Sequence, residues 1–128
     1  MSSVFTQIVE RKIPAYIVDE NEKFIAILAR GQVQHGHTLV IPKSYIDKYT
    51  DMDPKDFGEL QEYACIIAKK LKLAFPSKAR IIMNIVGFEV PHLHIHLIPS
   101  NSEKESYGPG NILSEDKMKT ILETIIGV

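Results

Sequence analysis

Three histidines, His92, His94 and His96, alternate with apolar residues in the second half of the chain. In a β-strand, residues two positions apart point to the same face of the sheet. The pattern therefore predicts a strand over 92–99 that displays three imidazoles on one face and buries the intervening aliphatic side chains on the other. One face of such a strand packs in the core, and the other face presents imidazoles that can bind or react.

Clustered imidazoles fit three kinds of role. The first is a set of hydrogen-bonded histidines with no reaction, which is less expected for three histidines on one face than for a single one. The second is a metal site, in which two of these histidines and a third from His35 or His37 supply nitrogen ligands for zinc or iron. The third is nucleophilic catalysis, in which a neutral imidazole attacks phosphorus and a charged neighbour neutralises the phosphate oxygens. Spacing alone does not rank the second and the third.

The elements that must position these histidines can be read from apolar runs and helix caps. Strands are expected at 15–18, 24–28, 38–41 and 80–86. Asp53 followed by Pro54 is typical of a helix start, and apolar residues at three- and four-residue steps extend this helix to about Leu73. Ser114 begins a C-terminal helix, and the polar segment 101–111 is expected to be a mobile loop. An antiparallel sheet with helices packed against it defines an α+β fold.

Length and composition exclude several classes of protein. The chain has 128 residues and a net charge near −1, which predicts one domain over 1–128, with a core at 3–100 and a C-terminal loop and helix at 101–128. No basic face for nucleic acid and no apolar run for a membrane span are present in the sequence. Cys65 is the single cysteine, so neither an internal disulfide nor a cysteine-based zinc site is expected. The first residues lack a signal-peptide pattern, so a cytoplasmic location is expected.

Several ordered motifs resemble one known family. The sequence His-Leu-His-Ile-His-Leu-Ile at 92–98 is similar to the signature of the histidine triad (HIT) superfamily of nucleotide hydrolases and transferases. Gly-His-Thr-Leu-Val-Ile-Pro-Lys at 36–43, Asn84, and Val-Pro at 90–91 also resemble family motifs, and the resemblance covers 3–100. Histidine at the third triad position is similar to the phosphoramidase (Hint-like) branch. The resemblance implies an α+β fold and a homodimer whose two half-sheets join.

The resemblance also implies a reaction and its residues. His94 would form a covalent nucleotidyl intermediate that water then hydrolyses, releasing a nucleoside monophosphate from a P–N or P–O–P linked substrate. The backbone carbonyl of His92 would orient His94, and a neighbouring imidazolium would keep His94 uncharged. His96 would contact the phosphate and help to protonate the leaving group, while His37 completes the cluster. The substrate-binding candidates are Phe5, Ile8, Ile27, Asn84, Gly87 and Glu89. No metal or other cofactor is implied, since in-line displacement on phosphorus depends on positioning and charge neutralisation.

Some positions differ from the family pattern. Ala29 occupies the place of an Asp that binds the ribose hydroxyls, and Phe88 and Glu89 replace a Gln and a Ser or Thr. Ser3 and Thr6 stand where many bacterial relatives carry zinc-binding cysteines. Two alternatives to a phosphoramidase therefore stay open: a dinucleoside polyphosphate hydrolase, and a nucleotide-binding protein that does not catalyse.

Overall fold

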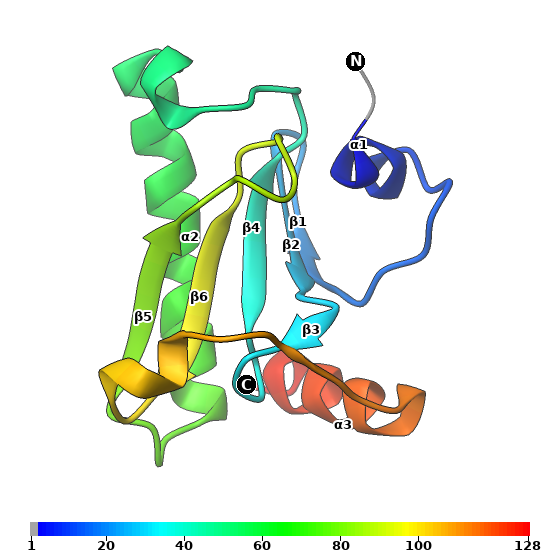
Figure 1. Cartoon of the computed structure of the whole chain (residues 1–128), viewed down its shortest axis with the longest axis vertical. Helices are drawn as coiled ribbons and strands as arrows, with labels where there is room; N and C mark the ends of the chain where they lie inside the picture. Colours follow the sequence, from blue (N-terminus) through cyan, green and yellow to red (C-terminus); the bar gives the residue numbers. More distant parts are fainter. Residues whose placement is uncertain (1–2) are drawn as a thin grey trace.

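The computed structural model describes residues 3–128 and centres on an antiparallel sheet of five strands (Figure 1). These are β1 (Ile17–Glu20), β2 (Phe24–Leu28), β4 (Thr38–Pro42), β5 (Arg80–Ile85) and β6 (Ile95–Ser100). Their order is β1-β2-β4-β6-β5, so β6 is an interior strand and β1 and β5 are the edges. The strands β3 (Gly31–Gln32) and β7 (Asn111–Ile112) pair separately. The helices are α1 (Val4–Val9), α2 (Pro54–Ala74) and α3 (Glu115–Ile126), with 3-10 turns at Tyr49–Asp51 and Glu103–Ser106.

The α+β class, the long helix and the C-terminal helix are confirmed. Asp53 Oδ1 accepts the N–H of Lys55 at 2.8 Å and caps α2. Ser114 Oγ accepts the N–H of Lys117 at 3.2 Å and caps α3. Such caps satisfy N–H groups that have no partner within the helix. Because the capping residue directly precedes the helix, these two helix starts can be predicted from the sequence.

The two faces of the sheet carry separate apolar cores. On one face, helix side chains such as Leu60 and Ile125 pack against Leu97 of β6. On the opposite face, Phe5 and Ile8 of α1 pack against aliphatic residues of β2 and β4. Because neighbours along a strand point to opposite faces, the histidine beside Leu97 points to the α1 face. The histidines and α1 therefore share one side of the sheet.

The strand predicted over 92–99 is wrong at its start, because β6 begins only at Ile95. The reason lies in β4, where the Pro42 carbonyl bonds with the side-chain Nε2 of His92 at 3.0 Å. That side-chain bond takes the place of a further backbone bond between β4 and β6, so the ladder ends at Ile95. His92 and His94 thus lie on a loop that leads into β6.

The segment 101–111, expected to be a loop, contains a 3-10 turn and the first residue of β7. Glu105 holds it, since one carboxylate oxygen lies 3.0 Å from Lys78 Nζ and accepts the N–H of Asn101 at 2.8 Å. β7 then pairs with β3, just before the loop that carries His37. Within residues 3–128, no helix is both long enough and apolar enough to cross a membrane.

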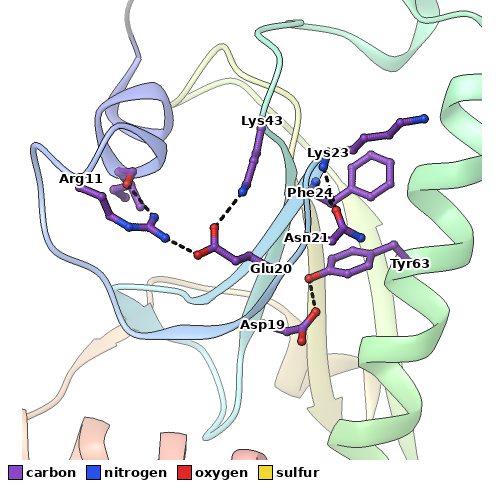
Figure 2. A network of polar contacts seen from close by, with 9 residues as sticks. Arg11, Asp19, Glu20, Asn21, Lys23, Phe24, Lys43 and Tyr63 are labelled. Carbon is purple, nitrogen blue, oxygen red and sulfur yellow. Dashed lines mark hydrogen bonds and ion pairs between the residues drawn. The ribbon is translucent and has the colours of Figure 1, made fainter.

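The helix α1 is not predicted by the sequence, since four of its six residues are β-branched and favour strands. Tertiary contacts hold it in place. Beyond its C-terminal end, Arg11 pairs with Glu20 of β1, and Glu20 also lies 2.9 Å from Lys43, directly after β4 (Figure 2). This bridge ties the end of α1 to two strands of the sheet.

Candidate active site

The centre of the site is a contact between two imidazoles from neighbouring strands. His37 precedes β4 and His96 lies in β6, and their Nε2 and Nδ1 atoms are 2.9 Å apart. The ring of His94 lies beside His96, with 4.8 Å between the ring centroids. Three of the four histidines predicted from the sequence as catalytic candidates therefore touch in a row.

His94 is held in one tautomer by the backbone. Its Nδ1 lies 2.8 Å from the carbonyl oxygen of His92. A carbonyl oxygen only accepts hydrogen bonds, so Nδ1 carries the proton of the neutral imidazole and Nε2 keeps a free lone pair. The structure thus shows the bond expected from the resemblance, and its result is an imidazole with a nucleophilic nitrogen.

His92 supports the site from behind. Its side chain is fully buried, and both of its ring nitrogens have partners: Ser3 Oγ at 2.7 Å from Nδ1, and the Pro42 carbonyl at 3.0 Å from Nε2. The rings of Phe5 and Tyr45 lie edge-on to it, at centroid distances of 5.7 and 5.3 Å. His92 therefore contributes its backbone carbonyl to the site, while its ring serves as a structural anchor.

Burial keeps all four imidazoles uncharged. The pKa of His37 and of His96 is lowered to about 4, mainly by burial and to a lesser extent by the nearby His94. Burial also lowers the pKa of His94 and of His92. Loss of solvent is the largest cause at His94 and the nearby His92 contributes less; His92 is itself neutral, not the imidazolium expected from the sequence. His94 is accordingly neutral, as a nucleophile must be, at neutral pH.

Asn84 supplies an unused acceptor next to the row. It lies in β5 directly opposite His96, so both side chains point to the same face. Its Oδ1 atom is buried and is without a hydrogen-bond partner among the described residues. A buried polar atom without a partner is uncommon in a folded protein.

Apolar candidates line the α1 side of the site. Phe5 lies edge-on to His94, with 4.9 Å between the centroids, so α1 brings it against that imidazole. Ile8 and Ile27 belong to the same apolar cluster as Phe5, and Ala29 is buried among them. The methyl group of Ala29 offers no hydrogen bond to a ribose.

The loop between β5 and the triad places its residues apart from the imidazoles. Gly87 has a φ of +82°, a conformation that suits glycine. Phe88 is 92% exposed, and Glu89 is also exposed. Within residues 3–128, no hydrogen bond joins Gly87 or Glu89 to the histidines, so the structure does not bring these two candidates into the cluster. The side chain of His35 is likewise exposed.

Two residues of the site escape sequence reasoning. Ser3 bonds to His92, and Tyr45 packs on the same ring while its hydroxyl donates to the Pro91 carbonyl at 2.9 Å. Ser3 could be found as a helix cap had α1 been predicted, whereas nothing in the sequence marks Tyr45. As for metals, no group of three His, Cys, Asp or Glu side chains within the described part of the chain is arranged to hold an ion.

Fold and site together define a class of small α+β domains that gather imidazoles where an interior strand begins. The pattern of the HIT domain matches residues 10–103, and the chain belongs to that family. An uncharacterised HIT-like protein of Mycoplasma genitalium is 36% identical over 111 residues, covering 84% of this chain and 79% of the relative.

A second relative and a solved structure extend the comparison. The adenosine 5′-monophosphoramidase of Schizosaccharomyces pombe is 28% identical over 131 residues, covering 98% of this chain and 96% of that protein. The crystal structure of a hypothetical histidine triad nucleotide-binding protein from Sulfolobus tokodaii superposes with a TM-score of 0.84 at 28% identity, covering 97% of this chain and 89% of the other.

Proposed function

We propose that this protein hydrolyses a P–N or P–O–P linked nucleotide through a covalent intermediate on His94. The observation that carries the proposal is the 2.8 Å bond from His94 Nδ1 to the His92 carbonyl, which leaves the Nε2 lone pair free. The similarity to an adenosine 5′-monophosphoramidase makes a phosphoramidate the first substrate class to test.

The reaction proceeds in two displacements on phosphorus. His94 Nε2 attacks the phosphorus atom, the P–N bond breaks, and the leaving amine takes a proton from His96. Water then attacks the phosphorus of the nucleotidyl-histidine, gives a proton to His96, and displaces His94 as a nucleoside monophosphate is released. The histidine is restored at the end of each cycle, as nucleophilic catalysis requires.

The residues around His94 supply a positive charge and a proton when the leaving group departs. A phosphate beside His96 favours the imidazolium form of that residue, since an opposite charge raises the pKa of a base. Its Nδ1 is engaged by His37 Nε2, which lies 2.9 Å away. The free Nε2–H is left to protonate the leaving group, and the Nδ2 amide group of Asn84 donates a hydrogen bond to a phosphate oxygen.

The proposal predicts a covalent adduct that depends on one residue. Brief incubation with an adenosine phosphoramidate should add one adenylate to the intact protein, and His94→Ala should abolish both the adduct and turnover. His35→Ala, which removes an exposed imidazole outside the row, is the matched control and should keep both. Intact-protein mass spectrometry beside a turnover assay measures these outcomes.

Other results would point to the alternatives. Turnover of a dinucleoside polyphosphate but not of the phosphoramidate would favour the dinucleotide hydrolase. Tight nucleotide binding with neither adduct nor turnover would favour a binding protein, which the missing ribose partner at Ala29 motivates. About one bound metal ion per chain, with activity abolished by chelation, would favour the metal-enzyme interpretation.

We also propose that one domain spans 1–128 and forms a homodimer through β5 and the adjoining face of α2. Within residues 3–128, β5 pairs only with β6, which leaves its outer edge available to a second copy. On α2, Cys65 and Ala68 line the surface beside β5, next to Ile81 and Ile82. Contiguous exposed apolar surface is typical of protein interfaces.

A further inference from the structure

Ser3 joins the start of α1 to the triad. Its hydroxyl oxygen lies 2.7 Å from His92 Nδ1 and accepts the N–H of Thr6 at 3.1 Å as the helix cap. Thr6 Oγ1 lies 3.2 Å from the same oxygen. A hydroxyl offers one proton and two lone pairs. If Ser3 donates to His92 and accepts twice from Thr6, all three are in use.

The direction of the bond to His92 follows from the other side of the ring. His92 Nε2 bonds with the Pro42 carbonyl, which can only accept, so Nε2 carries the proton of the neutral ring. Nδ1 is therefore the acceptor and Ser3 the donor. Because the His92 side chain is fully buried, loss of this donor would leave a ring nitrogen without solvent to replace it.

From these contacts we infer that Ser3 is a positioning residue for the nucleophile. By fixing the ring of His92, it fixes the carbonyl of the same residue, which holds His94 Nδ1 at 2.8 Å. For its effect on turnover, this inference rests on the proposed function.

The same hydroxyl fixes α1, which carries Phe5 against His94. Ser3 anchors one end of this helix, and the bridge from Arg11 through Glu20 to Lys43 ties the chain beyond its other end (Figure 2). Ser3 therefore contributes both to the position of α1 and to the orientation of His94.

Three variants separate positioning from helix capping. Ser3→Gly removes the hydroxyl but retains a residue that is tolerated at a helix cap at small energetic cost. Ser3→Thr keeps both the hydroxyl and the cap. Ser114→Gly makes the same change at the cap of α3, whose side chain bonds to Lys117 instead of to a histidine, and is the matched control.

Two measurements are made on each variant: the side-chain nitrogen resonances of the histidines by NMR at pH 7, and the turnover of an adenosine phosphoramidate. In Ser3→Gly, the Nδ1 resonance of His92 should move toward that of a ring nitrogen without a hydrogen bond. The kcat should fall about fivefold, the loss expected for one hydrogen bond, with KM nearly unchanged because Ser3 contacts His92 and not the substrate. Ser3→Thr and Ser114→Gly should retain the wild-type resonance and kcat.

The inference is overturned if the His92 resonance is unchanged in Ser3→Gly, if Ser114→Gly lowers kcat equally, or if Ser3→Thr fails to retain the wild-type values. Thermal unfolding of each variant establishes that the protein compared is folded. A wild-type protein that does not turn over the phosphoramidate would contradict the proposed function instead. The NMR measurement would still decide whether Ser3 fixes the ring of His92.

Discussion

His37 and His96 are buried imidazoles that touch each other, and the folded protein disfavours their charged forms. Burial is the main reason that their pKa values fall to about 4, whereas an imidazole in an unfolded chain has a pKa of about 6.5. Between these two values the unfolded state binds more protons than the folded state. The free energy of unfolding must therefore decrease as the pH is lowered through this window. Above the window, the contribution of these two imidazoles to stability no longer changes with pH.

This linkage gives a prediction at the scale of single residues. The free energy of unfolding of the wild type should change little above about pH 6.5 and fall from there to pH 5, and His37→Gln and His96→Gln should each show a shallower slope in that range. Some slope should persist, since burial also lowers the pKa of His92 and His94. Denaturant titrations at several pH values measure the slopes, and a measurement at pH 8 isolates the effect of each substitution on packing. Equal slopes in the wild type and in both variants would contradict the prediction.

Among the elements, those with local signals are predictable and those held by distant contacts are not. Asp53 and Ser114 predict the starts of α2 and α3, because a capping side chain bonds to N–H groups only two or three residues further along the chain. The start of β6 is missed because a side-chain bond from His92 to Pro42, fifty residues apart in sequence, replaces a bond of the ladder. For the same reason α1 is missed, since tertiary contacts override the strand preference of its residues. In the site, the resemblance anticipates the row of histidines, but not Ser3.

The loop that carries His37 depends on a glycine, which gives a prediction at the scale of elements. Gly36 has a φ of +95°, and a Cβ added there would lie 2.5 Å from Cε2 of Phe75. Gly36→Ala should destabilise the protein by about 2–4 kcal/mol, because backbone strain and overpacking add. Gly87→Ala is the matched control: its φ is +82°, but a Cβ would meet nothing within 4 Å. It should cost about 1 kcal/mol. Denaturant unfolding compares the two, and similar losses would show that the contact with Phe75 is not decisive.

In the whole molecule, the two edges of the sheet differ in character. β1 ends in Asp19 and Glu20, and both carboxylates are engaged, by Tyr63 and by the pair of basic residues in the bridge (Figure 2). β5 instead exposes Met83, which is 45% accessible, and Val86 follows it at 58%. Charged side chains blunt a sheet edge against pairing with another chain, and an apolar edge invites it. The contrast supports β5 as the edge that joins two copies.

If β5 is the interface, a charge placed there should weaken the dimer. Met83→Glu brings two carboxylates toward each other across a twofold axis and removes apolar contact, so the dissociation constant should rise at least tenfold, about 1.4 kcal/mol. Ile126→Glu alters an equally exposed apolar residue (51%) on α3, which packs against β1 and α2, and should leave the dissociation constant unchanged. Sedimentation velocity over a range of protein concentrations measures both. A wild-type protein that stays monomeric at high concentration would exclude the dimer. Equal weakening by the two substitutions would show that the interface is not at β5.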